Sequence, residues 1–335
     1  MSNYTYSSVF APHFEAFQRM KDAMGYQASN MPYVLKEFDL FFQKEEVTEP
    51  IITKDLVLKW RKGKVNETER TLYDKWSILS QFARYMCHIG FVCYVPRMPK
   101  RNFGTYIPYV FTHEQVKGIF EASDELIMPY NNMSSHLFCI PVLVRLLYST
   151  GMRIGEAVTL TNKDIDLQKD AIFLRKTKNQ QQRIVPISES LKKVLLQYID
   201  YRDKMQLPNL SSDGYHFLIS PNGYPLSICT ARQWFLKLLK LCGTPYIGGN
   251  HGPRVHDLRH TFAVHSLMRQ VREGADIYCV LPILATYLGH KTLFGTERYV
   301  RLTHEMYPDV VRMEESISSF VFPSMSLMMR ADEKE

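Results

Sequence analysis

Along most of the chain, apolar residues recur at spacings of three and four, the pattern of helices that bury one face. Residues 4–93 follow it throughout, most clearly over 67–89, and Gly90 comes next as a C-terminal cap. The apolar stripe of that helix consists of Leu72, Trp76, Leu79, Phe82 and Met86. Residues 55–64 predict a shorter basic helix that ends at Gly63. The first part of the chain is therefore expected to be helical.

The remainder predicts a mixed structure. Residues 112–115 (THEQ) form a capping box that opens a helix. Further helices are predicted over 135–149, 188–204, 256–268 and 281–288. Two β-prone runs, 171–174 and 183–187, flank a polar tip and predict a hairpin. The fold class is mainly α with a small β-sheet (α+β).

A break in this pattern divides the chain. Residues 95–108 contain three prolines and a glycine and have no periodicity, as in a linker. We expect a helical domain over 1–100, a linker over 101–110, a second domain over 111–322 and a flexible acidic tail over 323–335. A length of 335 residues suits two domains.

Positive charge is concentrated between residues 52 and 103. This segment holds 11 Lys and Arg against 4 Asp and Glu, an excess equal to the +7 of the whole chain. Such a segment can bind a phosphate backbone, although a solvated helix face explains it equally well. The candidates for DNA contact are Lys59, Arg61, Lys62, Lys64, Arg70, Lys75 and Arg84.

Composition excludes several classes of protein. The chain is 45% hydrophobic and 22% charged, as in ordinary globular proteins. No apolar run is long enough for a membrane span, and the N-terminus lacks the pattern of a signal peptide, so we expect a cytoplasmic location. The six cysteines form no C-x-x-C pair and favour free thiols over disulfides or a metal site.

Four short motifs carry residues suited to phosphate chemistry. YSTGMRIGE places Arg153 just after a helix terminator, and HDLRHTF places His256 and Arg259 on one helix face. LGH ends at His290, and Tyr299 follows nine residues later. Two guanidinium groups can hold phosphate oxygens, imidazoles can move protons, and a tyrosine hydroxyl can attack phosphorus.

The order of these motifs resembles the tyrosine recombinase family, also called phage integrases. TGMRIGE is similar to the family's T-G-L-R-x-x-E box, HDLRHTFA to its H-x-L-R-H-T-x-A box, and LGH with the later tyrosine to its final box. The resemblance implies that Arg153 and Arg259 bind the scissile phosphate. It also implies that His256 and His290 assist as hydrogen-bond donors and proton handlers, with Tyr299 as the nucleophile.

The resemblance assigns two further roles. Glu156 would support the site, and a hairpin lysine would protonate the leaving 5′-oxygen. Lys178 aligns best when the hairpin ending R-x-V-P is matched, while Lys176 points to the same face and remains an alternative.

For the whole protein, the resemblance implies a SAM-like helical core-binding domain and a catalytic domain that close round double-stranded DNA. It implies four protomers on two specific sites, a Holliday junction, a nucleoid location and accessory DNA-bending or directionality factors. It requires no metal or nucleotide cofactor. The expected function is integration or excision of a mobile element. One alternative is a type IB topoisomerase. The other is a DNA-binding regulator with a decayed site, and the filled catalytic positions argue against this second alternative.

Overall fold

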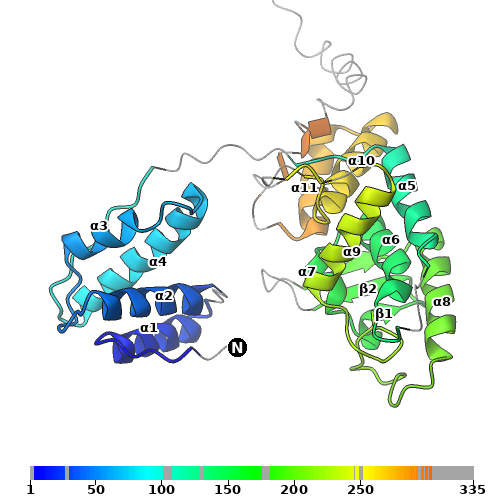
Figure 1. Cartoon of the computed structure of the whole chain (residues 1–335). Coiled ribbons are helices and arrows are strands. Elements are labelled where there is room, and N and C mark those ends of the chain that lie inside the picture. The colour runs from blue at the N-terminus through cyan, green and yellow to red at the C-terminus, as the bar shows by residue number, and fades with distance from the viewer. Residues whose placement is uncertain are drawn as a thin grey trace, which may run out of the picture. The chain divides into compact units, whose positions relative to one another are not determined.

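The computed structural model of the chain describes residues 4–26, 30–100, 108–127, 132–175, 182–244, 246–248, 252–290, 292, 296–297, 299–300 and 302–303. Two compact units, Met1–Thr105 and Tyr106–Glu335, make up the chain (Figure 1). The division lies inside the predicted linker. The predicted tail, 323–335, lies outside the described residues.

Helices form the described part of the first unit. They are α1 (Ala11–Ala23), α2 (Met31–Lys44), α3 (Lys54–Lys62) and α4 (Glu69–His88). The predicted helices over 55–64 and 67–89 are confirmed as α3 and α4. Each begins after a threonine whose side-chain oxygen accepts a hydrogen bond from the backbone N–H three residues further on. This threonine is Thr53 for α3 and Thr68 for α4.

Aromatic rings fill the core of this unit. Phe14 and Phe82 bring α1 and α4 together, with ring centroids 4.5 Å apart, and Phe10 of the segment before α1 lies 4.5 Å from Phe42 of α2. All four rings are buried. Burying so many large rings stabilises a small helical unit, because each one removes a large apolar area from water.

The second unit is mixed, as predicted, and mostly helical. Its longer helices are α5 (His113–Asp124), α6 (Ile140–Thr150), α8 (Glu189–Asp203), α9 (Ile228–Leu241), α10 (Asp257–Arg272) and α11 (Ile277–Leu288). Its shorter elements are η1 (Leu137–Cys139), α7 (Ile154–Val158), η2 (Asn162–Asp164), β1 (Ile165–Asp166), β2 (Ala171–Leu174) and β3 (Arg183–Pro186). The sequence analysis did not predict α9 or β1.

The strands form one antiparallel sheet in the order β1-β2-β3. The predicted hairpin is confirmed as β2 and β3, with Ile172 opposite Val185. Its tip, residues 176–181, lies outside the described residues, and both candidate lysines, Lys176 and Lys178, fall there.

Helix α6 runs through the middle of the second unit and contacts α5, α8 and α10, while α10 also packs against α11 (Figure 1). The C-terminal ends of α6 and α11 therefore lie near one face of α10. No helix in the described part of the chain is long and apolar enough to cross a lipid bilayer.

A buried histidine on α10 should make the stability of this unit depend on pH. Burial and the neighbouring His113 lower the pKa of His265 to about 4. The unfolded value is about 6.5, so the folded protein favours the neutral ring. The resulting stability is complete above pH 6.5 and is lost as pH falls toward 4. His256 and His290 act in the same direction.

We therefore expect the free energy of unfolding to fall between about pH 7 and about pH 4.5 and expect His265→Gln to reduce that decrease. Urea unfolding at the two pH values measures both quantities. An equal decrease in the variant would show that His265 does not contribute.

Candidate active site

Two helices end in glycines with left-handed backbone conformations, and their last carbonyls face the same side chains. Gly151 ends α6 with φ +59°, and Gly289 ends α11 with φ +65°. A Cβ on Gly151 would lie 2.4 Å from the Phe262 ring, so this position excludes any side chain. Both helices therefore stop abruptly and present negative carbonyl ends to the site.

Arg259 binds both helix ends. Its Nη1 donates to the Gly151 carbonyl (2.8 Å), and its Nη2 donates to the Leu288 carbonyl (2.6 Å). Only 2% of the residue is exposed. Burial and the nearby Arg153 lower the pKa of Arg259 to about 10, so the group is still charged at neutral pH.

Arg153 is held by a carboxylate that a second arginine shares. The Arg153 Nη1 donates to Glu156 Oε1 (3.0 Å), and its Nη2 contacts the Gly289 carbonyl (3.4 Å). Glu156 also accepts two hydrogen bonds from Arg183 of β3, at 3.0 and 2.7 Å. Burial raises the pKa of Glu156, but Arg183 and Arg153 outweigh it and hold the pKa below its usual value.

The two candidate histidines lie in an electropositive environment. Burial, and then the Arg259 charge, lower the pKa of His290 to about 4, and the pKa of His256 falls to about 4 for the same two reasons. His290 Nε2 accepts from Arg259 Nη2 (3.0 Å), since a guanidinium can only donate. The neutral ring therefore has its proton on Nδ1, which donates to Thr296 Oγ1 (2.7 Å).

Tyr299 lies beside this cluster. Its ring is stacked with that of His290, with centroids 6.1 Å apart, and its hydroxyl is 3.0 Å from Nδ1 of His260. Only 1% of the residue is exposed, and it belongs to the apolar cluster between α10 and α11.

The structure thus brings together the five described candidates, Arg153, His256, Arg259, His290 and Tyr299, and gives Glu156 a supporting position. Sequence reasoning missed three residues that contact them: Arg183, His260 and Thr296. Arg183 was visible as the R of R-x-V-P and His260 as the second H of H-x-L-R-H-T. No sequence signal marked Thr296.

Replacing Arg183 should lower the free energy of unfolding of the protein. Arg183→Met would leave the buried Glu156 with only Arg153 as an ionic partner, and we expect a loss of about 3 kcal/mol, since breaking a buried pair is costly. Urea unfolding measures this loss. The matched control is Lys192→Met, which breaks a more exposed pair with Asp170 and should cost about 1 kcal/mol or less.

Combining Arg183→Met with Glu156→Gln should destabilise the protein by less than the sum of the two single changes, because neither member of this pair is then left as a buried charge without the other. Additive losses would contradict the role given to this pair.

The candidates for DNA contact in the first unit differ in their surroundings. Lys75 is buried between Glu37 and Glu67, and Lys64 is also paired with Glu37. Lys59 is exposed and pairs with Glu45. The remaining four, which are also exposed, are Arg61, Lys62, Arg70 and Arg84. Lys75 and Lys64 are thus structural, and we leave both out of the proposed DNA contacts.

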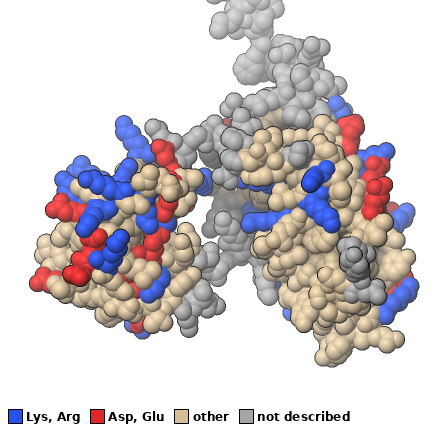
Figure 2. Space-filling model, in the orientation of Figure 1, with Lys and Arg blue, Asp and Glu red and all other residues tan. Residues whose placement is uncertain are grey.

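These ion pairs also reduce the local charge. Figure 2 shows Lys and Arg gathered over α3 with Asp and Glu among them. Residues 1–51 carry 4 Lys and Arg against 7 Asp and Glu. The net positive charge of the first unit is therefore smaller than the count over residues 52–103 alone indicates.

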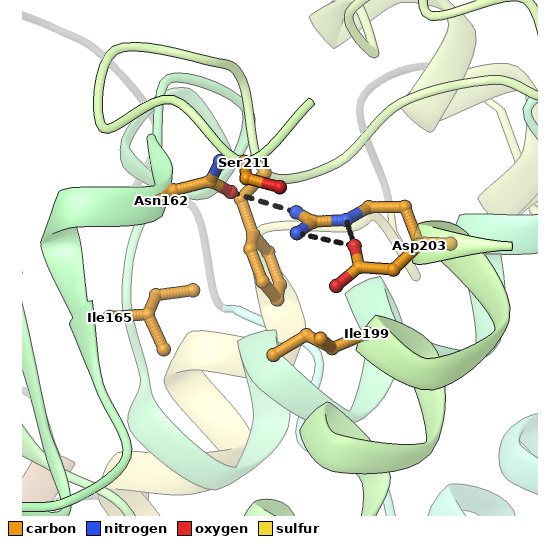
Figure 3. Close-up of a pocket in the computed structure, with 7 residues that line it drawn as sticks. Asn162, Ile165, Ile199, Asp203 and Ser211 are labelled. Carbon is orange, nitrogen blue, oxygen red and sulfur yellow. Dashed lines mark hydrogen bonds and ion pairs between the residues drawn. The ribbon is translucent and has the colours of Figure 1, made fainter. Parts of the chain in front are cut away.

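A separate pocket of about 230 Å³ is lined by Arg202 and its neighbours (Figure 3). Arg202 donates there to Asn162 (2.8 Å) and Asp203 (3.1 Å), and its guanidinium lies 5.3 Å from the Phe217 ring centre. The contact with Asn162 holds α8 against η2. None of the candidate residues lines this pocket, so it has no evident connection with phosphate chemistry.

Comparison with known proteins identifies the family. The model of the phage integrase family matches residues 109–306. Protein y4rB of Sinorhizobium fredii, named as an integrase/recombinase, is 27% identical over 92% of this chain and 98% of its own. Tyrosine recombinase XerC of Bacillus pumilus is 31% identical over 71% of this chain and 72% of its own.

Solved structures show the same fold. A lambda integrase dimer bound to a COC′ core site has a TM-score of 0.60 at 17% identity, covering 86% of this chain and 94% of that one. The Tn1549 transposon integrase in complex with transposon right end DNA also scores 0.60 at 17% identity, covering 88% and 99%.

The fold and these relatives define a tyrosine recombinase, an enzyme class that breaks and rejoins DNA. The chain belongs to the phage integrase family, whose model spans more than half of its length.

Proposed function

We propose that the chain is a site-specific recombinase in which Tyr299 attacks a DNA phosphate held by Arg153 and Arg259 and forms a 3′-phosphotyrosyl intermediate. The observation that carries the proposal is the placement of Arg259, His290 and Tyr299 side by side in one chain. One protomer can thus supply both the phosphate site and the nucleophile.

The charge of the cluster supports an anionic ligand. The site residues described above include three guanidinium groups, those of Arg153, Arg183 and Arg259, but only one carboxylate, that of Glu156. A bound phosphodiester would offset this excess. It would also raise the pKa of His290 and His256 from about 4, because the phosphate charge would offset the arginine repulsion that adds to the effect of burial. A protonated imidazole donates at both nitrogens, and His290 Nε2 would then exchange its contact with Arg259 for one with a phosphate oxygen.

Lys178, or Lys176 in its place, would protonate the leaving 5′-oxygen. We further propose exchange through a Holliday junction by four protomers on two sites, as part of the integration or excision of a mobile element. Support comes from relatives named as integrases and from DNA-bound neighbours of similar fold. Such an enzyme would act on nucleoid DNA in the cytoplasm, with accessory factors that set direction.

The experiment that tests this function starts from the genomic junctions that flank the gene. Two copies of the junction sequence are placed on a supercoiled plasmid, which is incubated with the full chain. A recombinase inverts or excises the intervening segment, whereas a type IB topoisomerase relaxes plasmids with and without the sites. Relaxation without any exchange of segments would contradict the proposal.

Exposed basic residues of the first unit should contribute salt-dependent affinity for DNA. We expect the combined change Lys62→Gln and Arg84→Gln to weaken binding and to flatten the dependence of log Kd on log salt, by up to about 0.9 per lost phosphate contact. Fluorescence anisotropy with a labelled junction duplex between about 50 and about 200 mM salt measures the slope.

The matched control is Lys193→Gln on α8, an exposed lysine next to Glu189, which should leave the slope unchanged. An unchanged slope in the double variant would remove Lys62 and Arg84 from the DNA interface, and the catalytic proposal would stand.

A further inference from the structure

The contact between Tyr299 and His260 joins residues that are far apart in sequence. The hydroxyl of Tyr299 lies 3.0 Å from His260 Nδ1, and the residues are only 1% and 8% exposed. His260 follows Arg259 on α10, so the backbone that positions the phosphate ligand also positions this imidazole. A shift of the helix would move both groups together.

We propose that His260 is the base that takes the hydroxyl proton of Tyr299 as this oxygen attacks the scissile phosphate. The inference rests on the proposed function and deepens it, because it assigns the destination of the nucleophile's proton. It also makes His260 a catalytic residue, since its Nδ1 touches the reacting oxygen.

A base is needed because a phenol with a pKa of about 10 is mostly protonated at neutral pH. A base must lie about 2.6–3.2 Å from the proton's donor atom, which His260 satisfies. His290, the other imidazole near Tyr299, is less suited. Its Nε2 accepts from Arg259, and its Nδ1 donates to Thr296, so both of its nitrogens are already engaged.

Each bond that forms during cleavage is matched by one that breaks. The O–H bond of Tyr299 breaks, its proton moves to Nδ1 of His260, and the freed electron pair on Oη forms the bond to phosphorus. The bond between phosphorus and the 5′-oxygen breaks, its electron pair stays on that oxygen, and a separate acid protonates it. In rejoining, the 5′-hydroxyl returns its proton to that acid, now in its deprotonated form, and attacks phosphorus. The bond between phosphorus and Oη breaks, and the departing Oη recovers its proton from His260.

The titratable groups near the His260–Tyr299 pair lie on α10 and just after α11. On α10, the ring centroid of His256 lies 5.0 Å from that of His260, and Arg259 is close enough for its charge to interact with that of a Tyr299 phenolate. His290, which follows α11, is stacked with Tyr299. The Arg259 charge favours the phenolate form of Tyr299.

His260→Asn separates the base from a merely structural contact, since an amide can accept the same hydrogen bond but cannot hold the proton. On a nicked suicide duplex made from the genomic junction, we expect covalent complex to form about 10²-fold more slowly, with unchanged DNA affinity. The wild-type rate should level off with rising pH, whereas the Asn rate should keep rising to about pH 9, because hydroxide replaces the base.

The leaving group provides the second readout. A substrate with sulfur in place of the bridging 5′-oxygen needs no acid and should rescue Lys178→Ala, but it should not rescue His260→Asn. The matched control is His265→Asn, which alters a buried histidine of the same helix whose Nδ1 lies 2.9 Å from another tyrosine hydroxyl, that of Tyr148. That variant should cleave at nearly the wild-type rate.

If the wild type forms no covalent complex with any junction duplex, the proposed function fails. If the wild type reacts and His260→Asn reacts within about twofold of it, or if sulfur rescues His260→Asn, the role of His260 is overturned. Should His260→Asn melt at a lower temperature than His265→Asn, His260→Gln takes its place under the same criteria.

Discussion

Tyr299→Phe is expected to abolish covalent complex formation while leaving DNA binding nearly intact. The change removes one oxygen and retains a ring that is buried between α10 and α11. The lost hydrogen bond to His260 should cost about 1 kcal/mol of stability, which the fold can tolerate. Phenylalanine supplies no oxygen that could become bonded to phosphorus.

A nicked suicide duplex traps the intermediate, and a denaturing gel separates protein joined to DNA from free protein. The same preparation of Tyr299→Phe is tested for duplex binding by anisotropy, which shows that it is folded. A covalent band from the phenylalanine variant would disprove the assignment of the nucleophile.

Arg259→Lys should reduce the cleavage rate by at least about 10²–10³-fold. The guanidinium bonds two carbonyls on separate helix ends and also His290, and one ammonium cannot reproduce that geometry. The replacement would therefore lose the orientation of the charge and the partner that holds His290. Single-turnover cleavage at saturating protein measures the loss separately from any loss of affinity.

The control for Arg259→Lys is Arg269→Lys, which changes an exposed arginine further along α10 that pairs with Glu273. It should cleave at the wild-type rate. If Arg259→Lys retained a near-normal rate, a positive charge alone would suffice for cleavage. The proposal that the guanidinium geometry of Arg259 holds the phosphate would then be wrong.

Local signals in the sequence were enough to predict most elements. The apolar stripe of α4, the capping box of α5 and the β-prone runs of β2 and β3 each depend on neighbouring residues. Helix α9 was missed although Ala231, Phe235 and Leu238 form a stripe, and β1 has only two residues and little pattern to detect.

The site residues that lie in recognisable sequence motifs could be predicted. Arg153, Arg259, His290 and Tyr299 were found from their order, and the structure brings them together. The pairing of His260 with Tyr299 depends on how α10 packs, which spacing along the chain does not show.

Counting charges along the first unit likewise could not reveal that Lys75 is buried between two carboxylates. Glu37, one of these partners, lies on a different helix and outside the counted segment.

The glycines that end α6 and α11 bear on how this protein tolerates mutation. The Arg259 guanidinium of the proposed phosphate site is oriented by two main-chain oxygens, those of Gly151 and Leu288, while Arg153 combines a contact to the Gly289 oxygen with its bond to Glu156. A main-chain oxygen is present whatever side chain its residue carries. Drift at Leu288 or at neighbouring positions can therefore change the packing without removing these acceptors, whereas the geometry fails if Gly151 acquires a side chain. Among the residues that orient Arg259, constraint should thus fall on Gly151 rather than on the side chain at position 288.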